Sequence, residues 1–573
     1  MHRHAVDSHS YNDAARANRR PRWCAQREDR FSGPGAAACT AQPWHGRHRT
    51  RPRRAGYTRM FSFADLIMKK IEIFLAAACC AVALHPAGAA DSGWPRARPE
   101  TVGIAPASIG KMLDYLAMVS RNGASLDGLV IVRDGKLVFE HYTPPYRGDI
   151  PHQLNSVTKS FVSTLVGIAQ GEGKIGPVTT PVHALLKDCR GALCDSPATL
   201  KDVLTMSSGL EWYEAGFSEE EDPSKILRSA DWRRYVLDKP MAEAPGQTFV
   251  YNSGGSHLLS LMLQDSLGGE SEAAFADDRL FKPLGISDYH WPVDPQGALI
   301  GGRGLTLRLD DLARFGQLFL QNGQWQGKQI VPATWVHDAT HAQIKTVPPF
   351  GWVPQYGYQW WVDGSGHNYS AQGWGGQVLI VAPKLGMVVA MLTSSDANGN
   401  GAWMTPDMLE QFFAQELKWQ GPIPLDDAGW GRLQQRLAAM APKPEKTVLP
   451  AWFKRLDGKT AQFSGLGWQS KPQFRLDADG VQIVADYRNR QQQDRATYSY
   501  GLGQWRNFDH PVYGPCVGKL TVSGDKVQLR ARSLREGKEI QTSYRMQDAK
   551  RIESVSENGG NAVSERAVGL IAN

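Results

Sequence analysis

The sequence predicts an α+β protein in which an antiparallel sheet packs with helices and is followed by a small all-β domain. Three observations predict this class. Apolar strand pairs occur early, near residues 129–140, and late, near residues 378–392. The chain between them has mostly the apolar periodicity of helices. Beyond about residue 445, short alternating runs with turn signals replace that periodicity.

The two strand pairs are predicted as hairpins. Leu129–Val132 and Leu137–Glu140 flank an Asp134-Gly135 pair, which supplies the positive φ that tight hairpin turns require. Val378–Val381 and Met387–Leu392 form the later pair. Because these hairpins lie far apart in the chain with helices between them, we expect one sheet assembled from distant segments.

Amphipathic runs between and after the hairpins are predicted as helices. They cover Ser160–Gln170, Ser256–Leu267 and Leu309–Leu320. A further helix is expected after Thr405-Pro406, an N-cap followed by proline at the first helical position.

The C-terminal part is predicted as an all-β sandwich or partial barrel, because its strands are short and evenly spaced. The expected strands are residues 461–464, 473–476, 480–484, 497–500, 519–522 and 527–530. We therefore expect a first domain over residues 91–425 and a second over residues 445–573.

The positive charge of the chain is confined to its first segment. Residues 1–67 contain 13 arginines, no lysine and five acidic residues, a balance of +8, so the formal charge of +7 leaves −1 for the remainder. A nucleic-acid partner is therefore not expected. We interpret residues 1–67 as an over-extended start, with a disordered basic leader as the alternative.

A signal peptide is predicted over residues 68–90. Met68 precedes two lysines, Ile73–Leu84 is apolar, and small residues precede a cut after Ala89 or Ala90. The apolar centre is shorter than the roughly 20 residues of a spanning helix, so we expect no stable membrane insertion after signal removal. The predicted location is the periplasm or the medium.

Three of the seven cysteines follow the predicted signal peptide: Cys189, Cys194 and Cys516. In an oxidising compartment Cys189 and Cys194 can close a small loop. We favour that disulfide, with two unpaired thiols as the alternative.

The strongest candidate for catalysis is Ser156, because Lys159 lies one helical turn away on the same face. The same Ser-x-x-Lys pattern starts at Ser108 and Ser523, but only Ser156 leads into a long amphipathic run. Two further segments complete a constellation. Phe249–Ser256 places Tyr251 in a turn before an apolar helix, and the glycine-rich Ala371–Gln377 enters a strand.

In order and separation these segments resemble the serine β-lactamase and penicillin-recognition superfamily. The resemblance is closest to the branch of class C β-lactamases, family VIII carboxylesterases and 6-aminohexanoate-dimer hydrolases. Leu200–Leu210 and Gly304–Ala313 fit it too, and it covers roughly residues 95–420. It implies a sheet flanked by helices, a helical lobe, and an active site between them.

Ser156 is expected to be the nucleophile, which requires a group that accepts its proton. Lys159 can do so only when neutral, so burial or nearby cations must lower its pKa. The resemblance assigns Tyr251 a proton-carrying role beside Lys159, and either residue can be the formal base.

The oxyanion is expected to bind the backbone N–H of Ser156 and, by the resemblance, that of Trp374. Ser253, Gly373, Trp374 and Gly376 are the expected substrate-binding residues, because glycines let a substrate carbonyl approach the strand. A plain hairpin is the alternative interpretation of the glycines. Six aromatic residues are candidates for a cleft wall, although core packing explains most tryptophans: Trp212, Trp291, Trp352, Tyr356, Trp360 and Trp361.

Other catalytic patterns are weaker. No Gly-x-Ser-x-Gly elbow occurs in the sequence. His152 is interpreted as a structural hydrogen-bonding residue, and His337 and His341 lack a third ligand, so no metal site is predicted. No cofactor is implied.

The sequence therefore predicts an exported serine hydrolase that cleaves a small amide or ester through an acyl-enzyme on Ser156. A β-lactamase or D-alanyl-D-alanine peptidase is the alternative within catalysis, and a silent penicillin-recognition module is the alternative outside it. Ala371-Gln372-Gly373 lacks the cation that β-lactamases usually carry there, and Tyr251-Asn252-Ser253 departs from their Tyr-x-Asn. Poor turnover of β-lactams is expected. The sequence predicts no oligomeric state.

Overall fold

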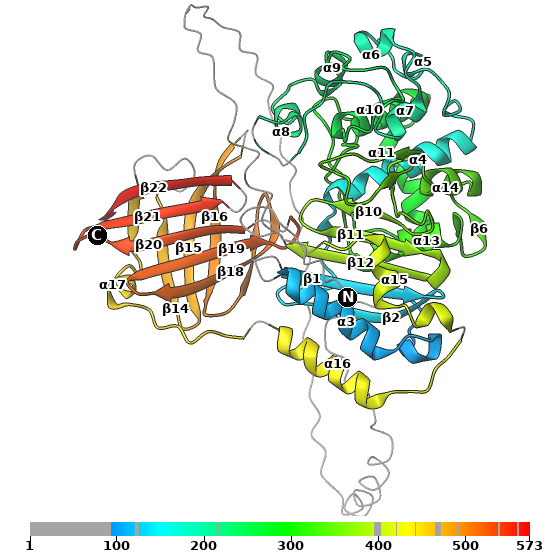
Figure 1. Cartoon of the computed structure of the whole chain (residues 1–573). Helices are drawn as coiled ribbons and strands as arrows, with labels where there is room; N and C mark the ends of the chain where they lie inside the picture. Colours follow the sequence, from blue (N-terminus) through cyan, green and yellow to red (C-terminus); the bar gives the residue numbers. More distant parts are fainter. Residues whose placement is uncertain are drawn as a thin grey trace, which may run out of the picture. The chain divides into compact units, whose positions relative to one another are not determined.

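The computed structural model describes residues 93–572, apart from 121–124, 216–217, 219, 395–402, 420, 442, 464–470, 490–491, 537–538 and 559–560 (Figure 1). The predicted leader and signal peptide, residues 1–67 and 68–90, lie outside the described residues. No helix in the described ranges combines the length and hydropathy that crossing a bilayer requires.

An eight-stranded antiparallel sheet forms the centre of the larger part, in the order β2-β1-β12-β11-β10-β9-β8-β7. Its strands are β1 (Ser125–Arg133), β2 (Lys136–Tyr142), β7 (Ile344–Lys345), β8 (Gln355–Tyr356), β9 (Trp361–Val362), β10 (Tyr369–Gly373), β11 (Gln377–Ala382) and β12 (Met387–Ser394). β1 pairs with β12, so the early and late hairpins meet as predicted. Asp134 and Gly135 both have positive φ in the first turn.

Helices cover both faces of this sheet. On one face α3 (Pro106–Val119), α15 (Pro406–Phe412) and α16 (Asp427–Met440) share a core with alternate residues of β1, such as Leu129 and Ile131. On the other face α4 (Thr158–Gly171) and α13 (Leu309–Leu320) share a core with Val130 and Val132, and α10 (Ser253–Ser266) packs against α4. The central strands β11 and β12 are largely apolar because both faces of the sheet are buried there.

A helical lobe lies along the chain between α4 and α13 (Figure 1). Its helices are α5 (Val182–Leu185), α6 (Ala192–Asp195), α7 (Leu200–Leu204), α8 (Asp222–Ile226), α9 (Trp232–Leu237), α10, α11 (Glu272–Ala276) and α12 (Lys282–Leu284). The predicted disulfide between Cys189 and Cys194 is present in this lobe. Further short elements include β3 (His152–Gln153), β4 (Thr306–Leu307), β5 (Gln324–Trp325), β6 (Lys328–Gln329) and α14 (Ala333–Thr340).

The C-terminal part is all-β, but it closes further than the predicted sandwich or partial barrel. Its elements are α17 (Ala451–Lys454), β13 (Thr460–Phe463), β14 (Gln473–Asp477), β15 (Gly480–Asn489), β16 (Gln492–Leu502), β17 (Arg506–His510), β18 (Gly514–Ser523), β19 (Lys526–Ser533), β20 (Glu539–Met546), β21 (Arg551–Asn558) and β22 (Asn561–Ala572). Because β16 also pairs with β18, nine of the described strands form a closed ring around an aromatic core, with β17 outside it.

Candidate active site

Ser156 and Lys159 meet where a 3₁₀ turn, Asn155–Val157, leads into α4. The amine nitrogen of Lys159 lies 2.9 Å from the hydroxyl oxygen of Ser156. Burial lowers the pKa of Lys159 to about 8; the carboxylate of Glu214 opposes this shift and the guanidinium of Arg303 adds to it. The structure thus provides the pKa shift that a lysine base requires.

The other two Ser-x-x-Lys patterns lie elsewhere. Ser108 is on α3, on the opposite face of the sheet from α4, and Ser523 ends β18 in the C-terminal part. Neither serine lines the cavity at Ser156.

Lys159 has two further hydrogen-bond acceptors. Its amine donates to the hydroxyl of Ser253 at 2.9 Å and to the carbonyl oxygen of Gly302 at 2.7 Å. Ser253 was predicted to bind substrate, but its hydroxyl contacts the lysine instead of lining the cavity. The Ser253 hydroxyl therefore lies beside the amine of Lys159.

Tyr251 directly precedes the N-cap of α10, which is Asn252. The Asn252 side chain accepts a hydrogen bond from the N–H of Gly255. The Tyr251 ring stacks on Phe350 and lies 4.8 Å from the amine nitrogen of Lys159. Burial raises the pKa of the Tyr251 phenol well above its ordinary value, the charge of Glu214 raises it further, and a hydrogen bond with Ser156 partly opposes this. The phenol of Tyr251 is therefore neutral in the folded protein.

Glu214 is a site residue that the sequence analysis missed. One carboxylate oxygen accepts from the Ser253 hydroxyl at 2.6 Å, and the other accepts from the Ser253 backbone N–H at 2.8 Å and the Trp212 indole N–H at 2.7 Å. Glu214 lies four residues after Leu200–Leu210, a segment that fits the resemblance to the β-lactamase superfamily. In sequence it is one of several acids before α8 and has no distinguishing spacing.

The end of β10 lies directly against the nucleophile turn. A Cβ on Gly373 would sit 2.2 Å from the Leu154 carbonyl oxygen and 3.1 Å from the Ser156 nitrogen. Asn155, with a positive φ, donates from its side chain to the Trp374 carbonyl oxygen at 2.6 Å. Gly373 is therefore required by the protein's own backbone, whereas the sequence analysis attributed it to substrate access.

The outer edge of β10 is open at this point, because β9 pairs only with Tyr369 and Ser370. Gly376 has a positive φ and donates its N–H to the Gly373 oxygen, so it belongs to the turn after β10 and does not line the cavity.

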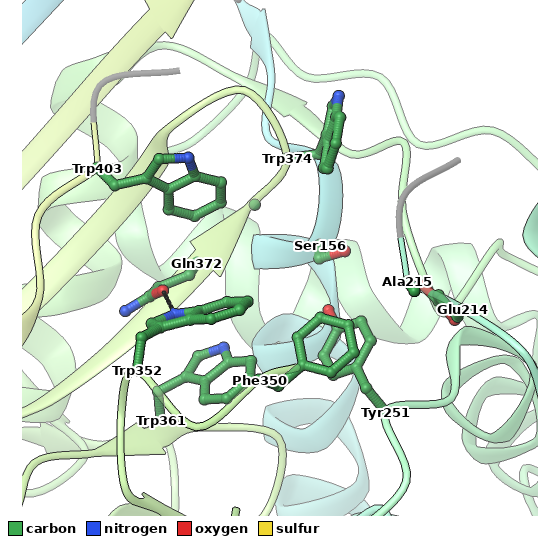
Figure 2. A pocket seen from close by; sticks show the side chains of 11 residues that line it. Ser156, Glu214, Ala215, Tyr251, Phe350, Trp352, Trp361, Gln372, Trp374 and Trp403 are labelled. Carbon is green, nitrogen blue, oxygen red and sulfur yellow. Dashed lines mark hydrogen bonds between the residues drawn. The ribbon is translucent and has the colours of Figure 1, made fainter. Parts of the chain in front are cut away.

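A cavity of about 90 Å³ opens at Ser156 (Figure 2). Its lining residues are Ser156, Glu214, Ala215, Tyr251, Phe350, Trp352, Trp361, Gln372, Gly373, Trp374 and Trp403. Figure 2 shows Trp352 and Trp361 on one side of Ser156, with the Trp352 indole N–H donating to Gln372 at 3.2 Å. Of the six predicted cleft aromatics, these two line the cavity, and Glu214 is its one charged lining residue among those described.

The three histidines considered in the sequence do not line the cavity. His152 is buried, and its Nδ1 lies 2.9 Å from the Gln153 carbonyl oxygen. His337 and His341 stack on each other on an exposed surface. In the part of the chain that the structure describes, no group of three metal-ligating side chains is placed to hold an ion.

Residues 114–413 match the family model described as Beta-lactamase. The 6-aminohexanoate-dimer hydrolase of Paenarthrobacter ureafaciens is 27% identical over 301 residues, which are 49% of this chain and 74% of that protein. Similar solved structures include the octameric penicillin-binding protein homologue from Pyrococcus abyssi (16% identical, TM-score 0.42, covering 81% of this chain and 99% of that one). A family VIII carboxylesterase is 14% identical (TM-score 0.41, covering 59% and 99%).

Proposed function

Because the chain belongs to the Beta-lactamase family of serine hydrolases, we propose that it cleaves a small amide or ester through an acyl-enzyme on Ser156. The observation that carries this proposal is the buried contact of Ser156 with Lys159, beside Tyr251. Nucleophile, base and proton carrier lie within one hydrogen-bonded group, as covalent catalysis by a hydroxyl requires.

In the proposed reaction, neutral Lys159 takes the Ser156 proton as the serine oxygen attacks the substrate carbonyl. The Ser156 and Trp374 N–H groups stabilise the resulting oxyanion. The phenol of Tyr251 protonates the leaving amine or alkoxide and is reprotonated from Lys159. Water then attacks the acyl group, the same groups carry its protons, and the acid product leaves Ser156 free.

The cavity lining favours an acyl group without an anionic substituent near the carbonyl. Its walls are largely aromatic, Ala371 provides no cation, and Glu214 adds a negative charge. Loss of one charged hydrogen bond costs a substrate carboxylate about 1.5 to 3 kcal/mol, roughly ten- to a hundredfold in affinity. Penicillins and cephalosporins are therefore proposed to be poor substrates. The name of the Paenarthrobacter relative supports small linear amides as the alternative to esters.

The direct test compares kcat/KM for nitrocefin and p-nitrophenyl butyrate on protein beginning at Asp91, with Ser156→Ala as the blank. We expect the ester to be the better substrate. A tenfold or greater preference for nitrocefin would replace this proposal with the β-lactamase alternative. Absence of turnover on esters, small amides and nitrocefin, with intact fold, would favour the silent binding module.

We also propose that the protein is exported. The support is the signal-like segment from Met68 and the Cys189–Cys194 disulfide, since disulfides persist in oxidising compartments. Intact-mass measurement of the native secreted protein should place its N-terminus at Ala90 or Asp91. A native N-terminus within residues 1–67 would contradict export by this route.

A further inference from the structure

The hydrogen bonds around Lys159 determine where a neutral lysine can direct its lone pair. The protonated amine has three N–H bonds and faces three oxygens, those of Ser156, Ser253 and Gly302. The neutral amine keeps two N–H bonds and gains one lone pair. The oxygen that donates a proton to this lone pair is the one that the lysine activates.

Two of the three oxygens accept only. The Gly302 oxygen is a carbonyl and has no proton. The Ser253 hydroxyl has one proton, and it donates this proton to Glu214 at 2.6 Å. Its remaining capacity is to accept from Lys159. Ser156 is then the one neighbour among the three that can donate to the lone pair.

Glu214 is held firmly in this arrangement. Its second carboxylate oxygen accepts from the Ser253 backbone N–H and from the indole N–H of Trp212, and the residue is 9% exposed. As a carboxylate it presents no proton to Ser253, so the direction of the bond between the two side chains is determined.

We propose that Glu214 is a positioning residue that acts through Ser253 to aim the lone pair of neutral Lys159 at the Ser156 hydroxyl. This inference rests on the proposed function, in which Lys159 is the base. It adds the third group that orients a base in nucleophilic catalysis. Glu214 itself transfers no proton.

The variant Glu214→Gln tests the bond direction with little change in shape. Two N–H donors face one end of the side chain, so the glutamine oxygen should turn to them and its NH₂ should face Ser253. Ser253 would then accept from residue 214 and donate to the lone pair of Lys159, leaving Ser156 without its base. We expect kcat for p-nitrophenyl butyrate to fall about 100-fold or more, with KM little changed.

Removal of the Ser253 hydroxyl should relieve this defect. In the double variant Glu214→Gln with Ser253→Ala, no hydroxyl remains to occupy the lone pair, so the double variant should be faster than Glu214→Gln alone. A merely structural role for Glu214 predicts equal or greater loss in the double variant. Glu214→Ala, which leaves the Ser253 proton without its acceptor, should show the same loss and the same relief.

The pH profile gives an independent readout. The charge of Glu214 raises the pKa of Lys159, so its removal should move the rising limb of kcat/KM to lower pH while the plateau falls. Glu243→Gln is the matched control, because Glu243 is an acid of the same lobe that accepts from the Thr248 hydroxyl and does not line the cavity. It should keep the wild-type kcat and profile.

Wild-type kcat and pH profile in Glu214→Gln, or a double variant no faster than the single one, would overturn the role of Glu214. These results can be separated from failure of the proposed function. If the Glu214 variants fail these tests but wild-type turnover depends on Ser156, the positioning role of Glu214 is wrong and the proposed function stands. If wild-type turnover survives Ser156→Ala, the proposed function fails and this inference fails with it.

Discussion

The amine nitrogen of Lys159 lies 2.9 Å from the hydroxyl oxygen of Ser156, and the lysine is 1% exposed. Water that would normally stabilise the ammonium is replaced by Ser253, Gly302 and the ring of Tyr251. The pKa of Lys159 is lowered for this reason, and a lysine of this kind can serve as a base near neutral pH.

The first prediction concerns pH. With a pKa of about 8, Lys159 is roughly one tenth neutral at pH 7 and nine tenths neutral at pH 9. Because the neutral form is the base, kcat/KM for an ester should rise about eight- to tenfold between these values and then level off. Lys159→Arg should be inactive throughout. A profile that is flat, or that rises only near pH 10, would exclude a lysine with this pKa as the base.

The second prediction concerns Tyr251. Burial keeps its phenol neutral, so Tyr251→Phe removes a proton donor to the leaving group, and kcat should fall by about 10² to 10⁴. The rising limb set by Lys159 should remain. Tyr356→Phe is the control, since Tyr356 is buried in the same aromatic cluster but does not line the cavity. Near-normal turnover in Tyr251→Phe would remove this residue from the mechanism.

The third prediction concerns Gly373. An alanine there places its Cβ 2.2 Å from the Leu154 oxygen, so β10 or the nucleophile turn must shift. We expect Gly373→Ala to lose most activity, because displacements of about 1 Å in a catalytic site can cost 100-fold. Gly110→Ala on α3, where nothing lies within 4 Å of the new Cβ, should keep full activity. Equal activities for the two variants would show that the close approach is not needed.

The fourth prediction concerns stability. Burial raises the pKa of Glu272 on α11 to about 8, and hydrogen bonds from Ser260 and the Leu299 N–H oppose this shift. The folded protein therefore binds a proton that the unfolded chain has lost between about pH 4.5 and 8, so this carboxyl destabilises the fold increasingly as pH rises through that window.

Glu272→Gln cannot ionise and should lose this dependence. The difference in Tm between Glu272→Gln and wild type should shift in favour of the variant from pH 5 to pH 8. A difference that stays constant with pH would contradict the raised pKa.

The part of the site that lies in short sequence motifs was predictable from the sequence. Ser156 and Lys159 were predicted from their shared helical face and the amphipathic run that follows, and the role of Tyr251 was predicted from the resemblance to the β-lactamase superfamily. Glu214 and Gly302 were not predictable. Glu214 has no periodic neighbours, and the contribution of Gly302 is a backbone carbonyl, which no residue type encodes.

The fold shows the same division. The hairpins around Asp134-Gly135 and before Met387 were predicted because turn chemistry is local. β20, β21 and β22 were missed, since charged and small polar residues occupy much of them, as in Arg551–Asn558. Closure of the ring depends on pairing of β16 with β18, a long-range contact without a sequence signal.

The central claim is that Ser156 is the single nucleophile. Reaction with a fluorophosphonate probe, followed by intact-mass measurement and peptide mapping, tests it most directly. We predict one label per chain, on the peptide that contains Ser156, and none in Ser156→Ala, while Ser108→Ala and Ser523→Ala label at the wild-type rate. A label that persists in folded Ser156→Ala would contradict the account.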